Sequence, residues 1–185
     1  MKFIYLIGIS LFLFSCNTSS KDMSKEYWEE LIQKTDDTIK LDFQQATKNQ
    51  NFRINTALYQ RAIERNLNFY QRFPTDTFSE VALDKVAALF LQINQESEAV
   101  KWRDTLLIKF PNTRNRIGLL ELQMNYYDFN QYNKEKINFY LEQLLASKEL
   151  TEEQRQSYEY RLKHIDLTFE ELILLQSQDA EDSVK

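Results

Sequence analysis

The chain has 185 residues, with 28 acidic against 23 basic side chains, one histidine and one cysteine. The formal net charge of −5 argues against nucleic acid as a partner, because proteins that bind nucleic acid present a basic surface. It argues equally against electrostatic attraction to anionic lipid headgroups. A single cysteine excludes an internal disulfide bond, and the length fits one domain.

The first 15 residues have the pattern of an export signal. Lys2 precedes an uncharged, mostly apolar run from Phe3 to Phe14, which is shorter than the roughly 20 apolar residues of a membrane-spanning helix. A basic start, a short apolar stretch and a small residue before the cut are typical of a signal peptide. We therefore expect residues 1–15 to be removed, and residues 16–23 to form a polar tether.

Cys16 ends the sequence "LFSC". This sequence resembles the lipobox of bacterial lipoproteins, with Leu13 three residues before the cysteine and a small residue directly before it, although Phe14 is larger than the usual middle residue. The resemblance implies that Cys16 is the acylated first residue of the mature protein, and more than one acyl chain would anchor it stably at a membrane. Asn17 is not the aspartate associated with retention at the inner membrane. We expect the protein to lie at the outer membrane of a Gram-negative bacterium, lipid-anchored and facing the periplasm. No strongly acidic tract follows Cys16 that would decide which leaflet carries the protein.

The rest of the chain predicts an all-α fold. Beyond residue 15 the sequence has one glycine and two prolines, whereas folds built from strands need many turn residues. Apolar residues recur at helical spacing, as in the set Leu58, Ala62, Ile63, Leu67 and Tyr70. The predicted helices are 24–47, 54–72, 77–92, 96–109, 114–129, 133–147, 151–165 and 169–176. Asp36 and Asp37 mark a candidate break in the first helix, and residues 177–185 are predicted to be a disordered tail.

Helix-start signals support these assignments. Thr77 to Glu80, Thr151 to Gln154 and Thr168 to Glu171 each fit a capping box, in which the hydroxyl and the side chain three residues later bond free backbone N–H groups.

A 37-residue repeat connects the middle helices. The two prolines, Pro74 and Pro111, are 37 positions apart, and each follows a phenylalanine. The same step joins Ala62 to Ala99, Ile63 to Val100 and Ile137, and Tyr70 to Leu107 and Leu144. A step of 36 pairs the preceding helices, with Leu83 matching Leu119, Val86 matching Leu122 and Phe90 matching Tyr126. The pattern predicts stacked helix–turn–helix units near residues 54–74, 75–111 and 112–148. In this arrangement we expect the rings of Phe73 and Phe110 to pack in the core between neighbouring units.

The repeat resembles the tetratricopeptide (TPR) family, in which a small residue on the second helix is followed by a proline 12 positions later. Ala62 with Pro74 and Ala99 with Pro111 match, whereas the third copy has Lys148 in place of the proline. The stretch from Phe69 to Pro111 is similar to the helical repeats of small outer-membrane lipoproteins. The resemblance covers roughly residues 54–176 and implies a TPR-like solenoid over 24–176, with capping helices at both ends.

The sequence offers little for catalysis. His164 is the lone histidine, so neither a metal site nor a nucleophile–base pair can be assembled from the usual residues. Adjacent acids such as Glu152 and Glu153 point in different directions on a helix and suit its first turn. No glycine-rich loop is present to cradle phosphate. We expect a protein that is not an enzyme and uses no catalytic residue, metal or cofactor.

The third unit contains a run of aromatic residues whose first explanation is core packing. Helical spacing cannot bury Tyr126, Tyr127 and Tyr132 together, however, and exposed tyrosines are enriched at interfaces. With Arg114 and Arg116 upstream, these tyrosines form a predicted protein-binding patch.

Three functions compete at this stage. The first is a membrane-anchored adaptor that binds a protein through its repeats, which in part rests on analogy with the repeat class. The second is a subunit of the machinery that assembles or secretes outer-membrane proteins. The third is an accessory lipoprotein that binds an oligosaccharide or peptide. The partner and the oligomeric state stay open.

Overall fold

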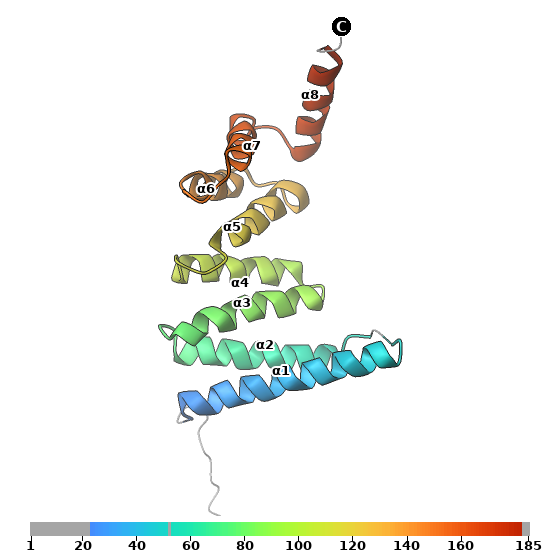
Figure 1. The fold of residues 1–185 in the computed structure, drawn as a ribbon, viewed down its shortest axis with the longest axis vertical. Helices are drawn as coiled ribbons and strands as arrows, with labels where there is room; N and C mark the ends of the chain where they lie inside the picture. Colours follow the sequence, from blue (N-terminus) through green and yellow to red (C-terminus); the bar gives the residue numbers. More distant parts are fainter. Residues whose placement is uncertain (1–22, 52, 183–185) are drawn as a thin grey trace, which may run out of the picture.

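In the computed structural model, residues 23–51 and 53–182 are described, and within these ranges the chain forms helices and no strand. The helices follow one another along the long axis of the molecule (Figure 1). They are α1 (Lys25–Lys48), α2 (Thr56–Arg72), α3 (Thr77–Gln92), α4 (Glu96–Lys109), α5 (Arg116–Asn125), a π-helix η2 (Tyr126–Asn130), α6 (Lys134–Leu145), α7 (Glu152–Lys163) and α8 (Phe169–Asp182). The all-α prediction is confirmed.

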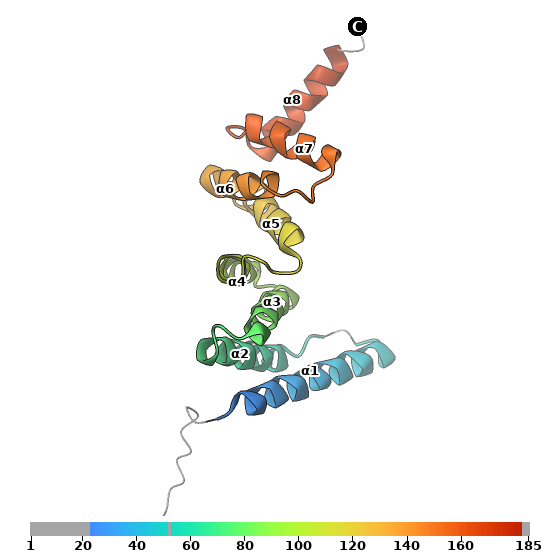
Figure 2. The ribbon, with the colours of Figure 1, turned by 60° about the vertical axis from the view of Figure 1, so that its left-hand side comes forward.

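The core is spread along this stack instead of gathering at one centre. Each helix from α1 to α6 packs against the next α-helix in the chain. Trp28, Ile32, Phe69 and Ala82 form a cluster at the N-terminal end, and a second cluster around Ala62 and Val86 follows. The largest cluster joins α4, α5 and α6, with Leu83 and Tyr158 at its edges. Figures 1 and 2 show α8 at the far end of the stack, where Leu172 is its buried residue.

The two Phe-Pro sequences form the same turn. Helix α2 ends one residue before Phe73, and α4 ends one residue before Phe110. The N–H of Phe73 donates to Phe69 O at 2.9 Å, and the N–H of Phe110 donates to Leu106 O at 2.8 Å. Both phenylalanine rings pack, partly buried, against core clusters, as predicted. The prolines that follow end the helices because proline has no N–H to continue the hydrogen-bond ladder.

Burial follows the 37-residue step through the first helices as well, so the predicted slip to 36 is wrong. Val86 is fully buried, but Leu122, its partner under the 36-residue step, is 49% exposed. The buried residue 37 positions after Val86 is Gln123. The sequence alignment paired apolar residues with apolar residues and therefore missed Gln123, which is polar. Its burial is possible because its amide nitrogen donates a hydrogen bond to Val100 O at 2.9 Å.

Helices α1, α3 and α8 differ from the predictions in an internal break, a cap and an end, respectively. Helix α1 runs without a break through Asp36 and Asp37, and Lys85 of α3 pairs with Asp36 across the interface. Helix α3 is capped by Asp76 and not by Thr77, since Asp76 Oδ1 accepts from the N–H of Phe78 at 2.8 Å. Helix α8 continues to Asp182, so most of the segment predicted as a disordered tail is helical. That segment contains no glycine or proline to stop the helix.

The other two helix-start predictions are confirmed. Thr151 and Gln154 form a capping box at α7, with bonds of 3.0 and 3.2 Å. At α8 the N–H of Thr168 donates to Glu171 Oε2 at 2.7 Å, and the N–H of Glu171 donates to Thr168 Oγ1 at 3.3 Å.

The predicted signal peptide, Cys16 and nearly all of the tether lie outside the described residues. Met23, at the end of the predicted tether, already packs against the N-terminal cluster. Among the helices that the structure describes, none combines the length and the apolar character needed to cross a membrane.

Candidate functional site

A groove of about 640 Å³ lies between α4 and α6. It is lined from α4 and its following turn by Asp104, Leu107, Ile108 and Pro111, from α5 by Arg116, and from the start and outer face of α6 by Asn133, Glu135, Lys136, Phe139, Tyr140 and Gln143. A hollow at the α4–α5 turn shares Pro111, Arg116 and Gln143 with it. Another hollow, beside the π-helix, shares Asp104 and Ile108. These three adjoining hollows are called the α4–α6 groove below.

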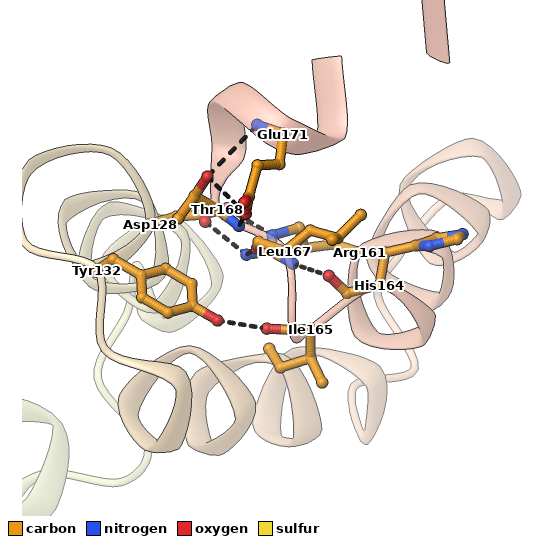
Figure 3. A network of polar contacts seen from close by, with 8 residues as sticks. All are labelled: Asp128, Tyr132, Arg161, His164, Ile165, Leu167, Thr168 and Glu171. Atoms are coloured by element: carbon orange, nitrogen blue, oxygen red, sulfur yellow. Dashed lines mark hydrogen bonds and ion pairs between the residues drawn. The ribbon is translucent and has the colours of Figure 1, made fainter. Parts of the chain in front are cut away.

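The groove collects four of the five residues of the predicted protein-binding patch. Arg114 and Arg116 line its end at the α4–α5 turn. Tyr126 and Tyr127 line its end at the π-helix. Tyr132 lies elsewhere, since its hydroxyl donates to Ile165 O at 2.7 Å in the segment between α7 and α8 (Figure 3).

The two arginines differ in how they are held. Arg116 is half-buried and donates to Leu107 O at 3.1 Å and to Gln143 Oε1, which fixes the start of α5 against α4 and α6. Arg114 is exposed, and its backbone N–H donates to Glu80 Oε1 at 3.3 Å. Arg116 is thus a positioned cation in the wall of the groove, and Arg114 adds charge at its rim.

A polar network forms the floor of the groove around Asp104. Asp104 Oδ1 accepts hydrogen bonds from the hydroxyl of Tyr140 and from Gln123 Nε2, and Oδ2 accepts from Lys136 Nζ at 3.2 Å. Burial of Tyr140, followed by its hydrogen bond to Asp104, raises the pKa of the phenol far above its usual value. The hydroxyl therefore stays protonated and remains a donor to the carboxylate.

Aromatic rings form the adjoining wall. The rings of Tyr127 and Tyr140 stack with their centroids 6.0 Å apart and their planes 12° from parallel. Tyr126 and Phe139 each meet one of these rings edge-on. Phe139 is 48% exposed and Ile108, across the groove, is 69% exposed. The groove thus offers solvent a surface that is apolar and aromatic, with charged groups set into it.

The sequence reasoning missed several residues of the groove. Asp104 and Lys136 were not singled out, and Phe139 was expected, with most aromatic residues of this run, to pack in the core. The same expectation for Tyr140 is confirmed, since it is 2% exposed and belongs to the largest core cluster. The 37-residue step contains the signal that identifies Asp104 and Lys136. Asp104 stands 37 residues after Leu67, and Lys136 stands 37 residues after Ala99. A charge at a position where the preceding unit has an apolar residue marks a departure from simple packing.

A second polar site joins the π-helix to α7 (Figure 3). Arg161 and Asp128 are both buried, and the guanidinium bonds the carboxylate through two parallel contacts of 2.8 and 2.7 Å. The same guanidinium donates to His164 O at 2.7 Å and to Leu167 O at 3.0 Å. The Asp128 hydrogen bond is the main cause that raises the pKa of Arg161. All three of its nitrogens donate within the chain, so this site holds the α7–α8 segment in place.

His164 belongs to the same region, where its ring lies 4.6 Å from that of Tyr160. Among the described residues, no group of three or more histidine, cysteine, aspartate or glutamate side chains is placed to hold a metal ion.

Comparisons of the chain with protein-family models, with curated proteins and with solved structures find no match.

Proposed function

We propose that this chain is a lipid-anchored adaptor of the bacterial envelope, and that its α4–α6 groove binds a segment of a partner protein. The observation that carries the proposal is the groove itself, which is lined by exposed Ile108 and Phe139 together with stacked tyrosines and a positioned arginine. Aromatic residues and arginine are the types enriched where proteins bind one another. An exposed apolar surface with a polar rim is uncommon on a protein that binds nothing.

The body that presents the groove is proposed to be a TPR-like solenoid. Two features support this proposal. The Phe-Pro turns after α2 and α4 repeat the same backbone hydrogen bonds. Burial also recurs at a step of 37 residues, as with Ala62 and Ala99, both of which are fully buried. Repeat proteins use the surfaces between successive units for binding, which is the place of the α4–α6 groove.

The groove can be tested by placing a photo-reactive amino acid at Ile108 in cells and irradiating intact envelopes. We expect a discrete cross-linked protein that mass spectrometry identifies. The matched control is the same amino acid at Val81, an exposed apolar position on α3 that does not line the groove. Equal cross-linking from both positions, or none from Ile108, would refute binding in the groove.

The anchor is a separate part of the proposal and needs its own test. Cys16→Ser should leave an unprocessed precursor or release the protein from the membrane fraction, because the acyl chains would have no attachment point. If the variant fractionates with membranes at its normal mature size, Cys16 is not the anchor.

An oligosaccharide is a second candidate ligand, because the half-exposed ring of Phe139 next to Tyr140 could stack on a sugar ring. Calorimetry with envelope oligosaccharides distinguishes the two. Heat of binding that Phe139→Ala abolishes would favour the sugar, whereas a protein cross-linked at Ile108 and no such heat would favour the adaptor.

A further inference from the structure

We infer that the α4–α6 groove recognises a basic side chain, lysine or arginine, of its partner at a site formed by Asp104, Tyr127 and Tyr140. This inference rests on the proposed function, since it names the chemistry of the segment that the groove would bind.

The carboxylate of Asp104 is held in position for such a contact. Tyr140 and Gln123 both donate to Oδ1, and both donors are buried. Among the residues that the structure describes, Lys136 alone bonds the second oxygen, Oδ2, and the Asp104 side chain is 19% exposed. A carboxylate with one oxygen fixed from inside the protein and the other turned to a groove is a preorganised acceptor for a cation.

The tyrosine rings complete the site. An ammonium or guanidinium group is attracted to the face of an aromatic ring within about 6 Å of its centroid. Tyr127 and Tyr140 are nearly parallel and stand beside the same carboxylate. Carboxylate and ring faces together match a cation that has an apolar stem, which is what lysine and arginine side chains are.

Lys136 shows that the site takes a cation, because its own ammonium group occupies it. Lys136 Nζ lies 5.6 Å from the ring centroid of Tyr127 and 6.0 Å from that of Tyr140, and 3.2 Å from Asp104 Oδ2. Both ring distances are near the outer limit of a cation–π contact. The Lys136 side chain is also 44% exposed. It is therefore an internal occupant that is held loosely enough to be replaced.

The scaffold itself does not require a lysine at this position. The equivalent residues in the two preceding units, Ala62 and Ala99, are fully buried alanines. Helix α6 packs through Ile137, Leu141 and Leu144, which are fully buried. Replacing Lys136 should consequently leave the fold intact while opening the site.

The test is a selection of random peptides displayed on phage against the full chain in detergent, followed by affinity measurements with the selected peptides. We expect lysine or arginine to be enriched at one position of the selected peptides. Lys136→Met should then strengthen binding by roughly ten-fold, because an internal competitor is removed, and Asp104→Asn should weaken it by roughly ten-fold or more. Glu142→Gln is the matched control, because Glu142 is an exposed acid of the same helix that lines none of the three hollows, and it should change affinity less than about two-fold.

A gain of affinity in Lys136→Met cannot come from misfolding, so that variant keeps the test decisive even if Asp104→Asn is destabilised. Selected peptides without basic residues, or unchanged affinity in both Lys136→Met and Asp104→Asn, would overturn the inference. Failure of this inference is distinguishable from failure of the proposed function. If Ile108 still cross-links a partner and Asp104→Asn leaves that cross-link unchanged, the groove binds a protein but not through a basic side chain.

Discussion

Helices α4 and α6 both border the groove, but residues 37 positions apart in them differ in what they contact. Ala99 and Leu106 of α4 are fully buried, and Trp102 packs against two core clusters. The residues 37 positions later are Lys136, Phe139 and Gln143, and all three line the α4–α6 groove. Positions 37 residues apart thus form a closed interface in α4 and an accessible surface in α6.

The difference shows where a stack of helices can carry an accessible groove at little cost to its fold. The residues that hold α6 in place, such as Ile137 and Leu144, are buried like their counterparts Val100 and Leu107 in α4. Three departures, at Lys136, Phe139 and Gln143, border the groove. A unit can therefore keep the apolar contacts that stabilise the stack and change the remaining positions for recognition.

Substitutions at the aligned residues Ala99 and Lys136 should give the largest difference in the free energy of unfolding. Ala99→Lys would force an ammonium group and a long stem into a fully buried site, which should cost about 4 kcal/mol or more. Lys136→Ala, the matched change in the open interface, should alter the free energy of unfolding by less than about 1 kcal/mol. Urea unfolding followed by circular dichroism measures both. Similar losses in the two variants would mean that α4 and α6 are not packed differently.

The C-terminal end of the molecule is held in another way, by the buried ion pair between Arg161 and Asp128. Arg161→Ala leaves the carboxylate of Asp128 buried and unpaired, and it also removes the donors to His164 O and Leu167 O. We expect a loss of about 3 kcal/mol in the free energy of unfolding, together with faster hydrogen exchange in α7 and α8. Lys163→Ala, an exposed change two residues away, is the control and should leave both quantities near wild type. Unchanged exchange in Arg161→Ala would show that the pair does not hold this segment.

A smaller difference should separate Leu106 from Gln143, which are also 37 residues apart. Leu106→Ala would leave a cavity in the largest core cluster and should cost about 2–4 kcal/mol. Gln143→Ala removes the acceptor for Arg116 in the groove wall and should cost less than about 1 kcal/mol. The midpoints of urea unfolding provide the measurement, and an equal loss in the two variants would contradict the assignment of one position to the core and the other to the groove.

Much of the fold could be predicted because helix boundaries and the repeat depend on local signals. The prolines at 74 and 111 end α2 and α4, and Thr151 with Gln154 starts α7, through interactions among a few neighbouring residues. The packing register of α5 could not be read in this way. It depends on Gln123, a polar residue that is buried because it finds partners 19 and 23 residues earlier in the chain.

The residues of the candidate site also differ in whether the sequence alone could predict them. Arg116 and Tyr127 were predicted because residue types enriched at interfaces stood out in the sequence, and both line the groove. Tyr132 has the same side chain as Tyr127, but it contacts a carbonyl 33 residues later in a segment that only the tertiary structure brings near. Asp104 becomes part of the groove because Tyr140, 36 residues on, bonds its carboxylate. Contacts of this range are set by how helices stack, which residue type alone does not encode.

The smallest expected effect concerns how the first helices of the two units begin. Asp76 caps α3 with a carboxylate, whereas the residue 37 positions later, Thr113, precedes a helix whose cap residue, Asn115, makes no side-chain bond. The hydrogen bond from Lys25, at 2.7 Å, and then that from the N–H of Phe78 lower the pKa of Asp76. A carboxyl group whose pKa is lowered on folding stabilises the folded state fully above its unfolded value of about 4, and this contribution is lost as the pH falls through the folded value. Asp76→Asn, which keeps a capping oxygen, should therefore flatten the dependence of the thermal midpoint on pH below about pH 4, with Lys25→Met changing it in the same direction. If the wild-type and Asp76→Asn curves stay parallel down to about pH 2, the ion pair between α1 and α3 does not contribute to acid stability.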